Sequence, residues 1–110
     1  MERFVKGKVV VIPFPFSDLS SSKKRPALVL ADLQGDDIIL CQITSQKVRD
    51  EYSIPLTSSE FAKGSLHKPS NVRPNRLFTA DKKSILRRVA TINSEKHKPI
   101  IERLVNLINA

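Results

Sequence analysis

Two short polar segments carry the side chains best suited to chemistry. Lys23–Pro26 (KKRP) stands at the start of one apolar run, and Thr44–Gln46 (TSQ) ends the next one. If the two runs pair as a hairpin, Arg25 and Thr44 converge. A guanidinium stabilises charge on a phosphate, while a neighbouring hydroxyl positions the same group. The pair would form a minimal site for metal-free RNA cleavage; the alternative is an arginine in a surface ion pair and a threonine favoured by its strand.

Other kinds of active site lack their usual residues. Cys41 is the single cysteine, which excludes an intrachain disulfide and a thiolate zinc cluster built from this chain alone. His67 and His97 lie thirty residues apart without an adjacent carboxylate or cysteine, so neither a metal site nor a cysteine–histidine pair is indicated. We expect His67 to be an exposed loop residue and His97 to cap or flank a helix.

The net charge of +8 is distributed unevenly along the chain. Residues 1–55 hold eight basic and seven acidic side chains, whereas residues 56–110 hold eleven basic and four acidic ones. Clustered lysine and arginine release counterions from nucleic acid whatever its sequence, so the second half predicts a phosphate-rich partner. A solvated basic surface that only keeps the protein in solution is the alternative.

The apolar pattern predicts mainly β structure. Gly7–Phe16 is rich in β-branched and aromatic residues, and its prolines place the end of this strand at a sheet edge. Pro26–Ala31 and Asp37–Ile43 are separated by a short glycine-containing segment and predict a β-hairpin. Further short strands are expected at Tyr52–Leu56, Asn71–Arg73, Leu77–Thr79 and Leu86–Ile92.

The period of the apolar pattern changes near the carboxyl end. Apolar residues recur at three- and four-residue steps from Ile100 to Ile108, as in an amphipathic helix. Two starts are open: a cap at Asn93 or Ser94, which leaves Pro99 inside the helix, or a start near Pro99. Many short strands followed by one helix favour a small barrel or a curled antiparallel sheet with the helix packed against it.

Length and composition set the remaining limits. With 110 residues, 40% of them apolar, we expect one domain over residues 1–110. The apolar run Val9–Ile12 stops at Pro13, far short of a signal-peptide core or a membrane span. We therefore expect a soluble, cytoplasmic protein.

Three segments follow one another in an order that covers nearly the whole chain. They are GKVVVIPFPFSDLSSSKKRPALVLA, the tetrapeptide ITSQ one hairpin later, and SNVRPNRLFTADKKSILRRVATI. The first segment is the most specific, because it joins a strand ending in PFPFSDL to a polar loop and then to KRPALVL. Together the three segments strongly resemble the PemK/MazF family of toxin endoribonucleases from bacterial toxin–antitoxin systems.

The resemblance implies an SH3-like barrel, a homodimer and sequence-selective cleavage of single-stranded RNA, chiefly mRNA, without a metal or other cofactor. The ribose 2′-hydroxyl would attack the adjacent phosphorus and leave a 2′,3′-cyclic phosphate and a 5′-hydroxyl. The family arginine falls on Arg25, which would stabilise the developing charge, and the family threonine falls on Thr44, which would orient the phosphate. The implied partners are single-stranded RNA and an antitoxin with an acidic flexible tail, and the toxin–antitoxin complex would bind operator DNA.

One position departs from the family pattern. Some members carry an arginine followed two residues later by an aspartate that acts as base, but here VRPN supplies Arg73 and Asn75. Arg73 still suits a phosphate, whereas an asparagine cannot abstract a proton. The base therefore stays open among Asp18, Asp81 and a substrate-assisted route.

The other candidate site residues would bind RNA. Phe14 or Phe16 would stack on a base, with core packing as the alternative for at least one of them. Lys68, Arg73 and Arg76 would follow the RNA backbone, with a solvated cluster as the alternative. The predicted RNA-binding set is Lys23, Lys24, Ser45, Gln46, Lys68, Arg73, Asn75, Arg76 and Phe16.

A second hypothesis is a non-catalytic toxin module on the same fold, one that binds nucleic acid or acts on gyrase. The gyrase-directed relatives rely on a tryptophan near the carboxyl end, and this chain has none. A third alternative is a degenerate member that mainly sequesters its antitoxin, because Asn75 replaces the acid. Salt-sensitive RNA binding without a cut would favour a binding module over an enzyme.

Overall fold

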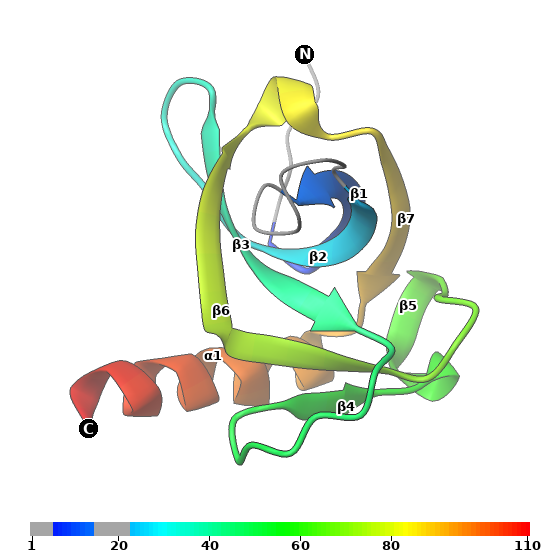
Figure 1. Cartoon of the computed structure of the whole chain (residues 1–110), viewed down its shortest axis with the longest axis vertical. Coiled ribbons are helices and arrows are strands. Elements are labelled where there is room, and N and C mark those ends of the chain that lie inside the picture. Colours follow the sequence, from blue (N-terminus) through cyan, green and yellow to red (C-terminus); the bar gives the residue numbers. More distant parts are fainter. Residues whose placement is uncertain (1–5, 15–22) are drawn as a thin grey trace.

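The computed structural model describes residues 6–14 and 23–110. Within these ranges seven antiparallel strands form one curled sheet in the order β4-β6-β3-β2-β1-β7-β5, followed by an α-helix (Figure 1). The predicted curled antiparallel sheet with a terminal helix is therefore confirmed. The elements are β1 (Lys8–Phe14), β2 (Lys23–Asp32), β3 (Asp37–Thr44), β4 (Ile54–Leu56), the 3-10 helix η1 (Ser58–Glu60), β5 (Phe61–Gly64), β6 (Ser70–Asp81), the 3-10 helix η2 (Lys82–Ser84), β7 (Arg87–Ile92) and α1 (Ser94–Asn109).

The central strands are buried on both faces. Successive side chains of a strand point to opposite sides, so Leu28 and Val29 enter two different clusters. Leu28 packs in a cluster that includes Ile100 of α1, and Val29 packs with Leu40 in a cluster that Phe78 of β6 helps to cover. Burying each such side chain contributes about 1.5–3 kcal/mol, and a slip of one residue would exchange the two clusters. The core thus fixes the register of the strands.

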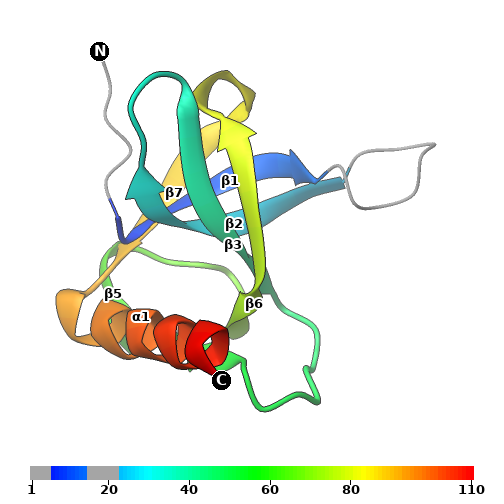
Figure 2. The ribbon, with the colours of Figure 1, turned by 90° about the vertical axis from the view of Figure 1, so that its left-hand side faces the viewer.

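The helix α1 begins at the earlier of its two expected starts. Asn93 is the N-cap, and its side chain accepts a hydrogen bond from the backbone N–H of Lys96 at 2.8 Å. Pro99 therefore lies inside the helix. Ile100 is completely buried and Leu104 packs on the same cluster, which holds the helix across one end of the sheet beside β6 (Figure 2). No helix in the described ranges is long and apolar enough to cross a membrane.

The expected hairpin of Pro26–Ala31 and Asp37–Ile43 is confirmed as β2 and β3, each slightly longer than predicted. The first strand also follows its prediction in part. β1 loses its β7 partner after Val11 but stays paired with β2 as far as Phe14. Pro13 therefore lies where the strand has one neighbour, which is where a missing N–H is tolerated.

Two of the later segments were correctly predicted as strand, but their separation into two strands was wrong. The pieces predicted at Asn71–Arg73 and Leu77–Thr79 form one strand, β6, whose register with β3 shifts between Cys41 and Gln42. Pro74 falls in that irregularity, where the ladder does not require its missing N–H. A proline inside a strand pattern thus marked a bulge rather than a break.

The strands flanking η1 were also predicted incompletely. Tyr52–Leu56 is longer than the observed β4, and β5 was not predicted. The four residues of β5 are mostly exposed and lack alternation, so no pattern announces them. Gly64 ends β5 with a φ of +66°, and a Cβ there would stand 2.3 Å from the carbonyl oxygen of Val89. This close approach to β7 requires glycine.

The register of three strands brings polar residues to one end of the sheet. β2 and β3 pair Ala27 with Gln42, and continuing this register sets Arg25 opposite Thr44. β3 and β6 pair Gln42 with Arg73 directly beyond the bulge. Residues that are far apart in the sequence therefore meet where β3 ends.

Candidate active site

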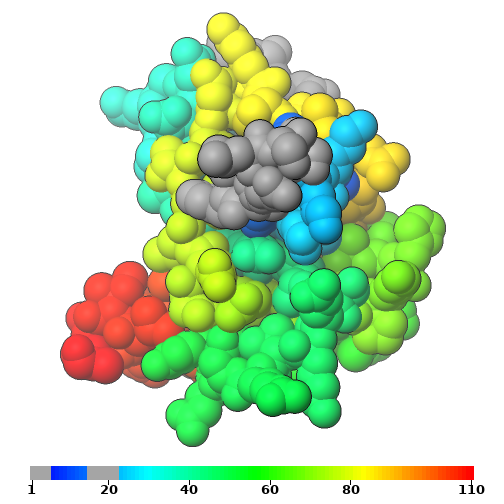
Figure 3. Space-filling view, in the orientation of Figure 1, coloured from blue at the N-terminus to red at the C-terminus, as the bar shows by residue number. Residues whose placement is uncertain are grey.

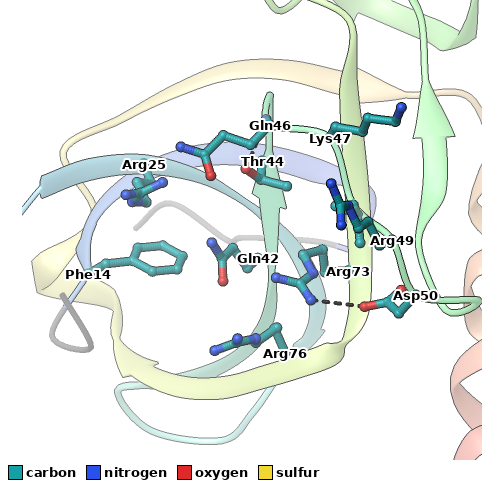
Figure 4. Close-up of a pocket in the computed structure, with 11 residues that line it drawn as sticks. Phe14, Arg25, Gln42, Thr44, Gln46, Lys47, Arg49, Asp50, Arg73 and Arg76 are labelled. Carbon is teal, nitrogen blue, oxygen red and sulfur yellow. Dashed lines mark hydrogen bonds and ion pairs between the residues drawn. The ribbon is translucent and has the colours of Figure 1, made fainter.

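An open cavity of about 510 Å³ lies where β2, β3 and β6 meet. Figure 3 shows parts of these strands and the loop after β3 reaching the same face of the molecule, and Figure 4 shows the side chains around the cavity. We call it the cationic pocket, because five basic side chains and, among the described residues, a single carboxylate line it. Its lining residues are Phe14, Arg25, Gln42, Thr44, Gln46, Lys47, Val48, Arg49, Asp50, Arg73 and Arg76.

The structure brings Arg25 and Thr44 together, as the hairpin geometry predicts. Both residues line the cationic pocket and also an adjoining cavity of about 300 Å³. Within the described part of the chain, no ion pair engages the Arg25 guanidinium. A cation that is half-buried and without a counter-charge is prepared to bind an anion from outside.

The hydroxyl of Thr44 is fixed by the turn that follows β3. The side chain is only 6% exposed, and its Oγ1 accepts a hydrogen bond from the backbone N–H of Gln46 at 3.1 Å. A hydroxyl can accept and donate at the same time. The Thr44 proton therefore remains available to a ligand oxygen while the turn holds the oxygen in place.

Arg73 is joined to the loop after β3 by an ion pair with Asp50. Its Nη2 donates to Asp50 Oδ2 at 2.9 Å, while Oδ1 accepts from the backbone N–H groups of Tyr52 and Ser53 at 3.0 and 3.1 Å. Burial alone would raise the pKa of Asp50, but the hydrogen bonds from Arg73, Tyr52 and Ser53 and the charge of Arg73 outweigh it and lower this pKa. Asp50 is therefore ionised at neutral pH.

Several of the predicted RNA-binding residues surround the pocket. Lys23, Lys24 and Ser45 line the adjoining cavity with Arg25 and Thr44. Gln46, Arg73 and Arg76 line the cationic pocket itself. The sequence thus identified residues from all three strands that form this face.

Asn75 lies beside an aromatic pair. With Arg76, it lines a third cavity, of about 170 Å³, whose walls include Phe14 and Phe78. The two rings meet edge to face, with their centroids 5.0 Å apart. Phe14 is 3% exposed and belongs to the core, so of its two expected roles, stacking on a base or packing in the core, the structure shows core packing.

Other predicted residues lie elsewhere. Lys68 is exposed and lines none of these three cavities. Asp81 pairs with Asp37 at the start of β3, whereas Thr44 ends that strand, so this candidate base lies at the opposite end of the ladder. Phe16 and Asp18 fall outside the described residues.

Four polar or charged lining residues were missed by the sequence analysis: Gln42, Lys47, Arg49 and Asp50. Gln42 had a detectable signal, because it is a polar residue in the otherwise apolar run IILCQI. The other three follow β3 in a segment without periodicity, so only the course of the loop shows that they turn back to the site.

The cysteine and the histidines lie outside the pocket lining. Complete burial raises the pKa of Cys41 to about 12, so its thiol is not a nucleophile at neutral pH. His67 is exposed, as predicted. His97 lies in the first turn of α1, where burial and the charge of Lys6 lower its pKa. Among the described residues, no group of three or more His, Cys, Asp or Glu side chains could hold a metal ion.

Solved structures share this fold across most of their length. MazF from Deinococcus radiodurans superposes with a TM-score of 0.77 at 19% identity, and each chain is covered completely. The Mycobacterium tuberculosis toxin MazF-mt6 gives a TM-score of 0.74 at 15% identity, with 93% of this chain and 96% of that chain covered. An endoribonuclease in complex with its cognate antitoxin from a mycobacterial species gives 0.76 at 11% identity, with coverages of 96% and 94%.

Sequence comparison extends the assignment from fold to family. A search of curated proteins finds no match. Residues 5–108, nearly the whole chain, match the family model described as PemK-like, MazF-like toxin of type II toxin-antitoxin system. The motif order, the curled sheet and this match agree, and the chain belongs to the PemK-like, MazF-like toxin family.

Proposed function

We propose that this protein is a metal-independent endoribonuclease toxin that cleaves single-stranded RNA. The observation that carries the proposal is that Arg25 and Thr44, 19 positions apart, line one open cavity together with Arg73. Five basic side chains around that cavity provide positive charge complementary to the negatively charged RNA backbone. Similar structures described as endoribonucleases support the same activity.

RNA carries its own nucleophile, so the protein needs to supply only position and charge. The 2′-hydroxyl oxygen attacks the adjacent phosphorus, the bond from phosphorus to the 5′-oxygen breaks, and a 2′,3′-cyclic phosphate and a 5′-hydroxyl result. Arg25 stabilises the negative charge that develops on the phosphate oxygens. The Thr44 proton binds one of these oxygens and sets the orientation of the phosphate.

The attacking hydroxyl must lose a proton, and the leaving 5′-oxygen must gain one. Among the described residues, Asp50 is the carboxylate that lines the pocket, but both of its oxygens already accept hydrogen bonds. Asp81 lies at the other end of the β3–β6 ladder. Of the candidates that fall on described residues, the arrangement favours the substrate-assisted route, in which a phosphate oxygen relays the proton, over Asp81. Asp18, the other predicted base, lies outside the described residues.

The same charge suits a protein inhibitor. Similar structures include a MazE–MazF complex and an endoribonuclease bound to its cognate antitoxin. We propose that an antitoxin with an acidic flexible segment neutralises this protein by occupying the cationic pocket. An acidic chain would meet the five basic side chains without needing a phosphate.

The activity is tested by incubating the purified protein with a long single-stranded RNA in EDTA and determining the ends of any fragments. We expect cleavage with 2′,3′-cyclic phosphate and 5′-hydroxyl ends. An RNA with 2′-O-methyl groups at the cleaved positions is the control, because it lacks the nucleophile and should stay intact. Intact RNA across varied sequences, with salt-sensitive binding retained, would instead support the non-catalytic module.

A further inference from the structure

The cationic pocket contains one group with the wrong charge for its proposed ligand. Asp50 is ionised and lies among the basic residues, where it repels a phosphate and lowers the positive field. It also belongs to none of the motifs in the sequence. A carboxylate in such a place needs a role that outweighs its cost to RNA binding.

The surroundings of Arg73 supply that role. Its side chain is 19% exposed, and its Nε is buried without a hydrogen-bond partner among the described residues. Four further cations, Arg25, Lys47, Arg49 and Arg76, line the same cavity and repel it. Asp50 is thus the counter-charge that keeps this guanidinium in place, since a half-desolvated cation without one would turn toward water.

Asp50 is itself held firmly. Two backbone N–H groups of the loop, from Tyr52 and Ser53, donate to its Oδ1, so the carboxylate has a fixed direction before it meets Arg73. Figure 4 shows the result: one terminal nitrogen of Arg73 meets Asp50, and the other points away from it, toward Gln42 and the interior of the pocket. The loop after β3 therefore aims a side chain of β6.

We propose that Asp50 is a positioning residue for RNA cleavage: it holds Arg73 so that the second terminal nitrogen of the guanidinium faces the scissile phosphate. The inference rests on the proposed function, and it assigns to Asp50 no proton transfer and no contact with RNA. The charge of Asp50 weakens RNA binding, but its ion pair fixes the Arg73 guanidinium at the reacting phosphate.

The variant Asp50→Asn separates these two effects. Its amide oxygen still accepts from Tyr52 and Ser53, so the loop keeps its turn, but its NH₂ group faces Arg73 without a charge. We expect the single-turnover cleavage rate to fall by about 10- to 100-fold, the cost of a misplaced group at the reacting centre. We expect RNA binding to be as tight as in the wild type or tighter, because a negative charge has left the pocket.

A matched control removes the same charge elsewhere. Asp32→Asn breaks the ion pair of Asp32 with Lys82, at 2.6 Å, far from the pocket lining, and should leave the cleavage rate unchanged. Asp50→Ser is a second neutral variant that keeps an oxygen for the loop N–H groups, in case Asp50→Asn folds poorly. Circular dichroism and thermal unfolding establish that each variant is folded.

A double-mutant cycle tests whether Asp50 acts through Arg73. If it does, Arg73→Gln and the double variant Asp50→Asn/Arg73→Gln should cleave at the same reduced rate. The rate of Asp50→Asn should also fall by the same factor across the neutral pH range, since no proton passes through this group. An additive loss in the double variant, or a pH profile that changes shape, would overturn the positioning role.

The remaining outcomes are equally decisive. Asp50→Asn that cleaves at the wild-type rate or faster would show that the ion pair does not position Arg73 productively. Weaker RNA binding with an unchanged single-turnover rate at saturation would show that Asp50 supports binding alone. A wild-type protein that never cleaves RNA would remove the proposed function itself, which distinguishes that failure from a failure of this inference.

Discussion

The two ends of the β3–β6 ladder differ in whether their charged side chains are balanced by neighbouring groups. At the end where β3 starts, Lys82 Nζ lies 2.6 Å from Asp32 Oδ1 and donates to the carbonyl of Gly35 at 3.0 Å, so its charge is matched locally. At the end where β3 finishes, five basic side chains surround a cavity with Asp50 as the described counter-charge. Paired charges hold a turn together, whereas an excess of one sign around a cavity needs a ligand to balance it.

The largest effect should follow from removing the Arg25 guanidinium, for which the described residues supply no ion pair. Arg25→Ala should lower the rate of RNA cleavage by about 100-fold or more, roughly 3 kcal/mol of transition-state stabilisation, as for loss of one preorganised donor to a developing oxyanion. Arg87→Ala is the matched control, because Arg87 is exposed at the start of β7 and lines none of the three cavities around the site. Cleavage by a folded Arg25→Ala protein at the wild-type rate would show that the excess of positive charge at the end of β3 does not serve catalysis through Arg25.

A smaller loss is expected at the hydroxyl. Thr44→Val keeps the buried shape but loses the donor to the phosphate, which should cost about 1.5–3 kcal/mol, or roughly 10- to 100-fold in rate. It also leaves the Gln46 N–H without its acceptor, so about 1 kcal/mol of folding stability should be lost. Thr44→Ser keeps the hydroxyl and should retain most of the activity. Equal rates for the valine and serine variants would show that Thr44 only supports the turn.

The candidate site was predictable where its geometry is local. Pairing two consecutive apolar runs as a hairpin is enough to bring Arg25 beside Thr44, since antiparallel register relates the start of one strand to the end of the next. Arg73 needs β6 to pair with β3 across a bulge, and no local pattern in the sequence specifies that register. The motif VRPN identified Arg73 only through the resemblance.

The charge count along the chain did not identify all the residues that supply the cations of the pocket. Residues 1–55 are nearly neutral, yet Arg25, Lys47 and Arg49 supply three of the five cations of the pocket. Some of the acidic side chains that balance them in this count, such as Asp32, pair with cations at other places in the fold. Net charge per segment ignores which side chains the fold brings together, and the loop after β3 could not be placed from its sequence.

The difference between the two ends is also measurable as salt dependence. Arg76→Ala removes one cation from the pocket and should reduce the slope of log affinity against log salt by about 0.7, the value for one phosphate contact on a single strand. Lys83→Ala removes an exposed cation beyond β6 and should leave that slope unchanged. Fluorescence anisotropy with a labelled RNA at several salt concentrations measures both. Equal slopes for the two variants would mean that RNA binds the whole basic surface rather than the pocket.

The smallest effect is expected at the ion pair of Glu60 with Lys96, which should contribute to the stability of the fold but not to RNA cleavage. Glu60 Oε2 lies 2.6 Å from Lys96 Nζ, and this ion pair joins η1 to α1. Glu60 Oε1 also accepts hydrogen bonds from the backbone N–H and the hydroxyl of Thr57. Burial alone would raise the pKa of Glu60, but the hydrogen bonds from Lys96 and Thr57 and the charge of Lys96 outweigh it and lower this pKa from its usual 4.5. A lowered pKa stabilises the fold above pH 4.5, and this contribution is lost as the pH falls through the lowered value.

Glu60→Gln should therefore reduce the free energy of unfolding by about 1 kcal/mol or less at neutral pH, because the pair is partly exposed to solvent. The difference from the wild type should shrink as the pH falls below 4.5, and RNA cleavage should not change at any pH. Urea unfolding at neutral and acidic pH measures the first effect, and Glu102→Gln is the control for loss of an exposed carboxylate on α1. A difference in stability that persists in acid would assign the loss to packing. A fall in the cleavage rate would instead show that the ion pair of Glu60 with Lys96 influences the side chains of the cationic pocket, as we propose for the ion pair of Asp50 with Arg73.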